Sequence, residues 1–405
     1  MTLPPNSPAS PAANPRVQKW HLSLFVKWGV IALVFAAYAT YLAGRVGHVT
    51  GALVDDIVWT VRAQRSVFAT GGENDYAWAV DMPGMSRFLY GITLHGLGLE
   101  NLPQREPDLT KRLDDPANQA LRLPRSAATS MRAVSIAAYM LGIVALFLAA
   151  RLILSNDYAA LLSVLPFMLC PSLSPAPPNS TTELTGTRIG PDACLLMMFG
   201  VSLTAWLYLD RRWPSWPWRS VLVMGLLGGL CVWAKWNGAL MLIAFGLWII
   251  LKEPKRGALK TLFAIGVAAG MLWALTPPFW THAPWQVVPD ILARREAVSA
   301  EHALVRPAMQ CSHWQVLVRS QAWLAIVAAA PLWVVRKQWW VSIVAAWGAS
   351  LGAGTVLVIT EMPLRYVAPW YMVILWVLPT ALVAALGLAK QEGGQPLKTK
   401  GGQRL

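Results

Sequence analysis

A succession of apolar segments, each long enough to cross a lipid bilayer, constrains the fold of this chain more than any other feature. About 20 apolar residues in a helix cross the hydrocarbon core, and a helix satisfies its backbone polar groups internally, as lipid requires. The sequence therefore predicts an all-α polytopic membrane protein. The predicted bundle has about ten transmembrane helices, at roughly 24–46, 132–154, 158–173, 192–209, 219–234, 237–252, 261–277, 317–335, 339–359 and 366–388.

The composition agrees with a membrane protein and argues against several other classes. Hydrophobic residues make up 56% of the chain and charged residues 13%, about half the charged fraction of a soluble domain. The 22 tryptophans fit the membrane interface. The net charge of +14 falls largely between apolar segments, so we expect no nucleic-acid partner. The four cysteines form no CxxC pair, which argues against a disulfide framework or a zinc site.

The distribution of basic residues orients the predicted helices. Short cytoplasmic connections carry an excess of Lys and Arg, and this rule fits when the N-terminus lies inside. We therefore expect a disordered cytoplasmic tail over 1–20, a transmembrane domain over 21–389 and a basic cytoplasmic tail over 390–405. Large outer loops are expected over 47–131 and 278–316, which makes the outer face the working face. The expected location is the inner membrane of a bacterium.

Asp55 and Asp56 form an adjacent acidic pair just after the first apolar segment. They open the stretch V-D-D-I-V-W-T-V-R-A-Q-R, whose periodicity predicts an amphipathic helix on the membrane surface. A water-accessible carboxylate beside lipid head groups is suited to act as a general base on a lipid-linked substrate. The alternative is a cap at a helix start, where carboxylates are favoured.

Other candidate residues lie where the outer loops meet the predicted helices. Asp81 precedes Pro83 in the first loop, and its alternative explanation is a proline turn before a second surface helix. Arg132 begins the second apolar segment, where an arginine ordinarily extends to the head groups. Asp192 follows Pro191 at the start of another apolar segment, where it can simply begin a helix.

Lys235 interrupts an apolar stretch of some thirty residues. A lysine in such a place is costly unless it reaches water or an anion, and its compact charge suits a phosphate. The segments on either side are short, so a bent or partly re-entrant pair is an alternative to two full spans. Arg365 and Tyr366 lie at the outer end of the last segment, where a guanidinium can hold a lipid phosphate or extend to the head groups.

Taken in order, these features resemble a glycosyltransferase of the GT-C class. The resemblance is greatest to the branch with protein O-mannosyltransferases and bacterial lipid A aminoarabinose transferases, and it covers about residues 25 to 385. It is carried by the order of short motifs: Asp55-Asp56, Asp81-Met82-Pro83, Arg132, I-G-P-D at Ile189 to Asp192, G-L-x-x-x-x-K-W-x-G at Gly229 to Gly238, P-P-F-W at Pro277 to Trp280, and R-Y-x-x-P-x-Y at Arg365 to Tyr371.

The resemblance implies transfer of a sugar from a polyprenyl-phosphate donor to an acceptor hydroxyl on a glycan, lipid or protein. Asp55 would be the general base of an inverting displacement, and Asp56, where the family usually has Glu, would support it. The implied substrate-binding residues are Asp81, Arg132, Asp192, Lys235, Arg365 and Tyr366. Lys235 and Arg365 would neutralise the leaving phosphate. No cofactor is expected, and no metal ion is predicted. Because the pattern's soluble C-terminal domain is not expected here, the membrane core and outer loops would recognise the acceptor.

A transporter or flippase for a lipid-linked or anionic solute is the alternative function. Such proteins also place Lys and Arg in broken membrane helices. The chain shows no internal repeat, however, and its polar residues concentrate in one outer loop rather than at the midplane. We expect membrane lipids as partners under either function.

Overall fold

The computed structural model describes residues 15–46, 54–66, 73–81, 84–99, 102, 103, 106, 121, 123–154, 156–169, 189–213, 215–305 and 380. Within these residues the secondary structure is entirely helical. The chain divides into two compact units, Met1–Tyr41 and Leu42–Leu405, which are described separately. The predicted apolar segments beyond residue 305, and with them the count of ten, lie outside the described residues apart from residue 380.

Helix α1 spans Pro15–Val46 and contains the candidate membrane span Phe25–Gly44. It begins earlier than expected, because residues 15–20 are helical rather than part of the tail predicted over 1–20. Proline is well tolerated at the first helical position, where its missing N–H would have no helical partner. The polar residues that follow it extend the helix without disturbing the apolar span.

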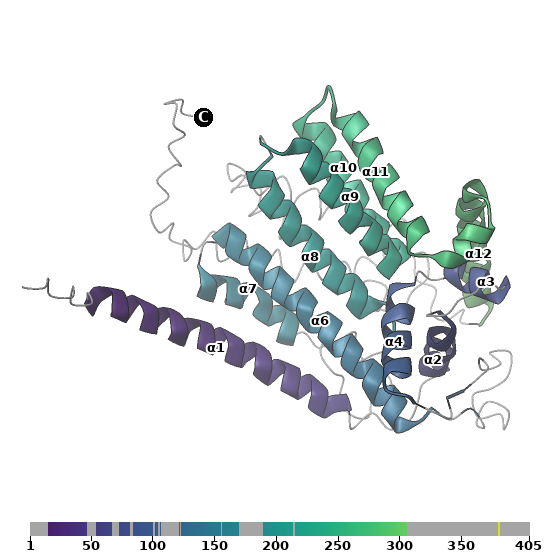
Figure 1. Ribbon diagram of the computed structural model, residues 1–405, viewed down its shortest axis with the longest axis horizontal. Coiled ribbons are helices and arrows are strands. Elements are labelled where there is room, and N and C mark those ends of the chain that lie inside the picture. The colour runs from purple at the N-terminus through teal and green to yellow at the C-terminus, as the bar shows by residue number, and fades with distance from the viewer. Residues whose placement is uncertain are drawn as a thin grey trace, which may run out of the picture. The chain divides into compact units, whose positions relative to one another are not determined.

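Four further helices are long and apolar enough to cross a membrane: α6 (Arg125–Leu154), α8 (Asp192–Arg211), α9 (Pro217–Ala234) and α11 (Gly257–Ala274). Neighbouring helices contact in the order α6, α8, α9 and α11, as Figure 1 shows. Helix α10 (Ala239–Lys252) is apolar but shorter, and it packs on α9 and α11. Helix α7 (Asp157–Leu169), where a span over 158–173 was expected, has 13 residues. These helices support an integral membrane protein with several spans.

Small residues bring α6 and α8 together. A Cβ added at Gly200 would lie 2.7 Å from the carbonyl oxygen of Gly142, and one at Gly142 would lie 3.0 Å from the backbone nitrogen of Met197. Thr204 adds a 2.6 Å hydrogen bond from its hydroxyl to the carbonyl of Ala145. Such close approach between backbones is the usual packing mode in lipid, where apolar side chains gain little by leaving the solvent.

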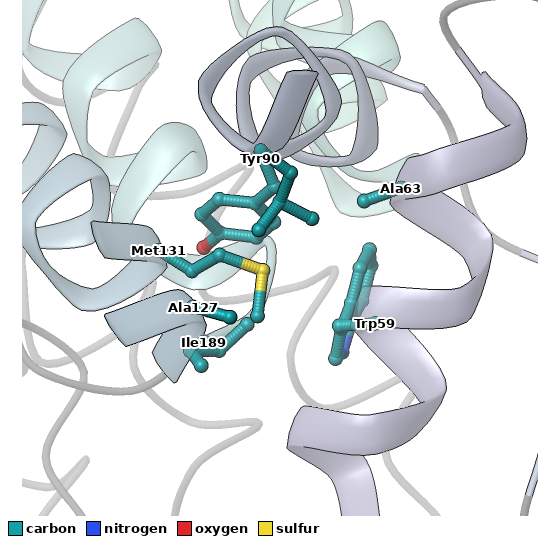
Figure 2. Packing of buried hydrophobic residues seen from close by; sticks show 7 residues of the cluster. Trp59, Ala63, Tyr90, Ala127, Met131 and Ile189 are labelled. Carbon is teal, nitrogen blue, oxygen red and sulfur yellow. The ribbon is translucent and has the colours of Figure 1, made fainter. Parts of the chain in front are cut away.

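Three shorter helices of the segment 47–131, which was predicted as an outer loop, form a cap beside this bundle: α2 (Val54–Ser66), α3 (Glu73–Asp81) and α4 (Met85–Gly96). Helix α2 packs on α4, which in turn contacts α6 and α9. The predicted helices after Asp55-Asp56 and after Pro83 are therefore present. The core between cap and bundle is drawn in Figure 2 and consists of Trp59, Ala63, Tyr90, Leu94, Ala127, Met131 and Ile189.

Helix α2 is more enclosed than a helix lying on the membrane surface. Trp59, Thr60, Val61 and Ala63 are all buried, so protein covers several sides of the helix. The amphipathic pattern predicted a single apolar stripe. The additional burial arises because Trp59 and Ala63 pack into the core beside α4 and α6, a long-range contact that local periodicity does not contain.

The segment 278–316, which was predicted as a second outer loop, is also helical where it is described. A short 3-10 helix, η2 (Pro277–Thr281), precedes α12 (Pro284–Val305). Both contact α3, and Ala79, Val80, Phe279 and Val287 form a second buried cluster there. The two segments, about 200 residues apart in sequence, thus meet beside the end of α11.

Candidate functional site

The apolar stretch around Lys235 is broken by one extended residue. Helix α9 ends at Ala234, Lys235 has φ −164° and ψ 146°, and the 3-10 helix η1 (Trp236–Gly238) leads into α10. A Cβ at Gly238 would lie 2.0 Å from the carbonyl oxygen of Cys231, so the bend requires glycine. We call Lys235 to Gly238 the elbow. It corresponds to the bent pair that the sequence left open.

The elbow places the ammonium group of Lys235 against Asp192. The Lys235 Nζ to Asp192 Oδ1 distance is 2.5 Å, and the two side chains are 12% and 15% exposed. Asp192 is the first residue of α8, where the positive end of the helix dipole also favours a carboxylate. The sequence offered a helix start and a substrate contact as alternatives for Asp192. The structure shows the helix start together with an ion pair to Lys235.

Tyr90 fixes the backbone just before Asp192. Its hydroxyl donates to the carbonyl of Gly190 at 2.9 Å and accepts from the N–H of the same residue at 3.0 Å. Ser135 of α6 lies 2.7 Å from the same hydroxyl. Burial raises the pKa of Tyr90 well above its ordinary value, with the nearby Cys194 and Asp192 adding to the rise. Tyr90 is fully buried and anchors the start of α8.

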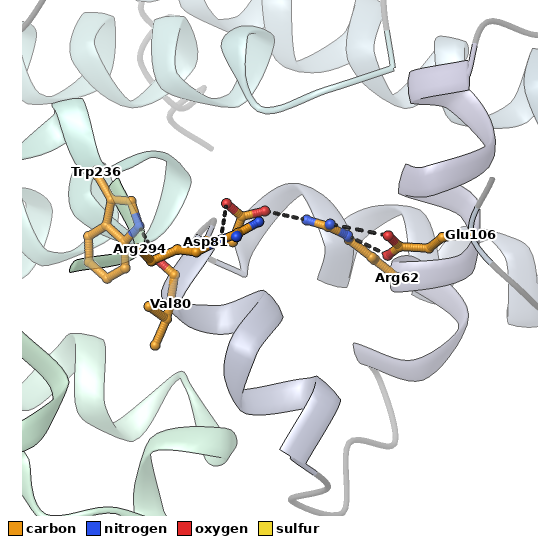
Figure 3. Close-up of polar contacts among 6 residues, drawn as sticks. All are labelled: Arg62, Val80, Asp81, Glu106, Trp236 and Arg294. Atoms are coloured by element: carbon orange, nitrogen blue, oxygen red, sulfur yellow. Dashed lines mark hydrogen bonds and ion pairs between the residues drawn. The ribbon is translucent and has the colours of Figure 1, made fainter. Parts of the chain in front are cut away.

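Asp81 lies at the end of α3 between two arginines (Figure 3). Its Oδ2 is 2.9 Å from Arg62 Nη1, and its Oδ1 is 3.4 Å from Arg294 Nε. Arg62 also binds Glu106, with 2.7 Å between Nε and Oε1. Burial by itself would lower the pKa of Arg62, but Glu106 and Asp81 together hold it above the ordinary value. Asp81 therefore joins the cap to α12 through a charged chain.

The elbow and the Asp81 cluster are joined by Trp236. Its indole nitrogen donates to the carbonyl of Val80 at 3.0 Å, one residue before Asp81 (Figure 3). On the preceding turn of α9, the Trp233 indole lies against the backbone at Gly84, where an added Cβ would be 2.7 Å from its nitrogen. Trp236 of the elbow thus contacts the end of α3, and Trp233 of α9 contacts the residue before α4.

An aromatic pair lies beside Asp81 at the contact of α3 with η2. The rings of Tyr76 and His282 stack with centroids 3.5 Å apart, and the Tyr76 hydroxyl donates to Asp290 of α12 at 2.5 Å. Burial, followed by the bond to Asp290, raises the pKa of Tyr76 well above its ordinary value. His282, the residue that follows η2, therefore helps to join η2 to α3.

Of the remaining predicted site residues, the structure describes the side chain of Arg132 alone. Arg132 lies in α6, where it is 3% exposed and follows Met131, whose sulfur accepts the Thr60 hydroxyl of α2 at 3.8 Å. Asp55 and Asp56 belong to the first turn of α2, but their side chains lie outside the described residues. Arg365 and Tyr366 also lie outside them.

The structure therefore brings Asp81, Asp192 and Lys235 into one region between the cap and the bundle. Sequence reasoning missed Trp236, which joins the elbow to Val80, and two members of the Asp81 cluster, Glu106 and Arg294. Trp236 was part of the K-W motif and offered a signal, whereas Glu106 and Arg294 stand in polar stretches without a distinguishing pattern.

Among the described residues no group of three or more His, Cys, Asp or Glu side chains could hold a metal ion. Comparisons of the chain with protein-family models and with curated proteins found no match. The site must therefore be interpreted from its own chemistry, which combines a paired lysine, carboxylates and arginines beside apolar helices.

Proposed function

We propose that this chain is an integral-membrane glycosyltransferase of the GT-C class. It would move a sugar from a polyprenyl-phosphate donor to an acceptor hydroxyl on the outer side of the membrane. The observation that carries the proposal is the Lys235–Asp192 ion pair, which lies where two apolar helices end beside the cap. A phosphate arriving from the lipid side can take the place of Asp192 at the ammonium group.

The proposed chemistry divides between the two sides of this region. A carboxylate, assigned to Asp55 in the first turn of α2, removes the proton of the acceptor hydroxyl as the oxygen attacks the anomeric carbon. The bond from that carbon to the phosphate oxygen breaks, and polyprenyl phosphate leaves with the electron pair. Asp56 supports the base. Lys235 and Arg365 neutralise the charge that develops on the departing phosphate, where stabilisation lowers the barrier most.

Asp81, Arg132 and Tyr366 complete the proposed set of substrate-binding residues. For Asp81, the support is its place between Arg62 and Arg294, which holds its carboxylate at the contact of the two outer loops. For Arg132, the support is its burial on α6 next to the contact with α2. In this proposal the cap orients the acceptor, and the elbow holds the donor phosphate.

The test is sugar transfer from a defined polyprenyl-phosphate sugar by the purified full-length protein in lipid nanodiscs. Asp55→Asn should lower turnover by about 10²- to 10⁴-fold, the usual contribution of a general base, while donor binding is retained. Lys235→Met should weaken donor binding as well as turnover. Equal turnover in wild type and Asp55→Asn would contradict the base assignment.

Lys252→Met provides the matched control for Lys235→Met. Lys252 also ends an apolar helix and also pairs with an aspartate, Asp210, but at the opposite end of the bundle. The proposal expects this variant to retain wild-type transfer. Comparable losses in both lysine variants would indicate a general effect on the bundle rather than a role of Lys235 in the reaction.

A transporter remains the competing function because the break at the elbow is also a feature of transport proteins. The same nanodisc protein reconstituted into sealed vesicles separates the two functions. Movement of a fluorescent lipid-linked sugar across the bilayer, without formation of a glycosylated product, would favour transport and contradict the proposed transfer.

A further inference from the structure

The connection between α8 and α9 carries a second charged cluster, far from the elbow. Arg212 lies over the rings of Tyr208 and Trp216, with its Cζ 4.9 and 5.0 Å from their centroids. Arg219, from the first turn of α9, lies 5.7 Å from the same Trp216 centroid. All four side chains are exposed. We call Tyr208, Arg212, Trp216 and Arg219 the arginine–aromatic turn.

The backbone of this turn is held by its own hydrogen bonds. The N–H of Ser215 donates to the carbonyl of Arg212 at 3.0 Å, and the N–H of Trp216 donates to the same carbonyl at 3.1 Å. The N–H of Ser220 then donates to the carbonyl of Trp216 at 2.9 Å as α9 begins. The two arginines thus extend from a connection that is already ordered, which lowers the entropy lost when they bind a ligand.

The carboxylates next to this turn are already paired with lysines. Asp210 binds Lys252, and Glu253 binds Lys260 while accepting the Trp213 indole N–H at 2.5 Å. Within the described part of the chain no carboxylate pairs with Arg212 or Arg219. The residues 210–219 alone contain three basic side chains and one acidic side chain, Asp210. The surface therefore carries positive charge that its own acids do not balance.

The position of the turn indicates where its ligand comes from. It joins two candidate membrane spans, α8 and α9, whose other ends carry Asp192 and the elbow. Helices of 20 and 18 residues rise about 27–30 Å, close to the thickness of the hydrocarbon core. The arginine–aromatic turn thus lies at the membrane border opposite the elbow, at the depth of lipid head groups.

We propose that the arginine–aromatic turn binds the phosphate of an anionic phospholipid. Guanidinium groups match phosphate oxygens with paired hydrogen bonds, and rings that are apolar on one side and wet on the other suit the interface. The uncompensated positive charge selects a lipid with net negative charge over a zwitterionic one. This site does not depend on the transfer reaction proposed above.

The experiment is native mass spectrometry of the purified full-length protein titrated with phosphatidylglycerol or with phosphatidylcholine of the same acyl chains. The wild type should bind phosphatidylglycerol about tenfold more tightly, a difference of about 1.4 kcal/mol. Arg212→Gln/Arg219→Gln should reduce this preference to less than about twofold. Equal binding of the two lipids by the wild type would overturn the proposal.

The matched control is Lys255→Gln/Arg256→Gln. These two exposed basic residues lie on the neighbouring α10–α11 connection, and removing them costs the same net charge. This variant should keep most of the preference for phosphatidylglycerol. If it loses as much as the arginine variant, the attraction is a diffuse electrostatic effect and there is no site at Trp216.

A second variant, Arg212→Lys/Arg219→Lys, separates loss of the binding site from a folding defect. It preserves both charges but removes the planar guanidinium groups, so the preference should fall about threefold, to an intermediate value. Circular dichroism and size-exclusion chromatography check the fold of each variant. A lysine variant with unchanged preference would contradict a site built on guanidinium geometry.

Discussion

The two ends of the helix pair α8 and α9 place their positively charged side chains in different environments. At the elbow, Lys235 is largely enclosed and pairs with the carboxylate of Asp192. At the other end, Arg212 and Arg219 are exposed and lie over an aromatic ring. The same pair of helices therefore ends once in a partly buried ion pair and once in an open cationic surface.

The difference reflects the cost of removing charge from water. An enclosed ammonium group requires an opposite charge because its desolvation costs several kcal/mol. Removing either partner of the ion pair leaves the remaining charge desolvated without the compensating attraction. A guanidinium group at the head-group depth keeps its water and gains only modestly from a neighbouring ring. Substitutions at the elbow should therefore have much larger effects on stability than equivalent substitutions at the opposite end.

The largest effect is expected from Asp192→Asn, which removes the charge of the Asp192 carboxylate that lies 2.5 Å from the Lys235 ammonium group. Loss of one partner of an enclosed pair costs about 3 kcal/mol or more, so thermal unfolding in detergent should occur at a distinctly lower temperature. The double variant Lys235→Met/Asp192→Leu should recover much of the loss. A double variant as unstable as the single one would show that the pair is not the source of the effect.

The comparison partner for this prediction is Asp210→Asn, which removes the carboxylate from Lys252. Lys252 is 33% exposed and also lies over the Trp213 and Trp248 rings. An ion pair in such a position contributes about 0–1 kcal/mol. Thermal unfolding of Asp210→Asn should therefore stay close to wild type, and a shift as large as that of Asp192→Asn would remove the contrast between the two ends.

The next largest effect is expected at the glycine of the elbow. Gly238→Ala places a methyl group against the backbone of Cys231, which cannot move away as a side chain can, and overpacking of this kind costs about 1–3 kcal/mol. The control is Gly270→Ala in α11, where an added Cβ meets nothing within 4 Å. That change should be neutral or slightly stabilising, since alanine favours a helix. The unfolding temperatures of the two variants measure this difference. Equal shifts for Gly238→Ala and Gly270→Ala would argue against close backbone packing at the elbow.

A smaller effect is expected from Tyr90→Phe, which removes the hydroxyl that binds Gly190. Its loss should cost about 1–2 kcal/mol because the buried backbone groups at Gly190 lose a partner. Tyr208→Phe removes an exposed hydroxyl at the opposite end and keeps the ring beside Arg212, so its unfolding temperature should remain near wild type. Equal stability of the two variants would contradict the anchoring role of Tyr90.

The smallest effect concerns the protonation of Glu253. Burial alone would raise the pKa of this carboxyl, but its bonds to Lys260 and Trp213 and the charge of Lys252 hold it below the ordinary value of 4.5. Because the folded pKa is the lower one, Glu253 stabilises the fold above about pH 4.5, and this contribution is lost as the pH falls through the folded value. The stability difference between wild type and Glu253→Gln should narrow as the pH falls from 7 to 3. A stability difference between the two proteins that stays constant with pH would contradict the lowered pKa of Glu253.

The sequence predicts the local features of this fold well. The helix that follows Asp55-Asp56, the second helix after Pro83, the start of α8 at Asp192 and the break at Lys235 all agree with local patterns of apolar residues, prolines and glycines. Such features depend on a few neighbouring residues, so a single sequence contains them. For the same reason, α12 was missed, because its mixed polar and apolar residues resemble a loop.

The connections within the candidate site are not predictable in the same way. Asp192 and Lys235 are 43 residues apart, and Tyr76 reaches Asp290 over 214 residues. Taken alone, Asp192 resembles a helix start and Lys235 an isolated charge in an apolar stretch. Which of them meet is decided by packing of the cap on the bundle, where Trp59 and Tyr90 share a core with Met131, and no local pattern specifies that packing.

The bend at Lys235 also limits how deeply α10 can reach. Its 14 residues rise about 21 Å, which is some 9 Å less than a hydrocarbon core of about 30 Å. With Lys252 held at one border, α10 alone stops short of the opposite border, and η1, which rises about 6 Å, together with the extended Lys235 covers most of the remaining distance. Mismatch between a span and the bilayer costs fractions of a kcal/mol per Å. The lipid acyl chain length is therefore a variable that acts directly on the elbow, because a thicker bilayer draws the Lys235 ammonium group away from the water layer.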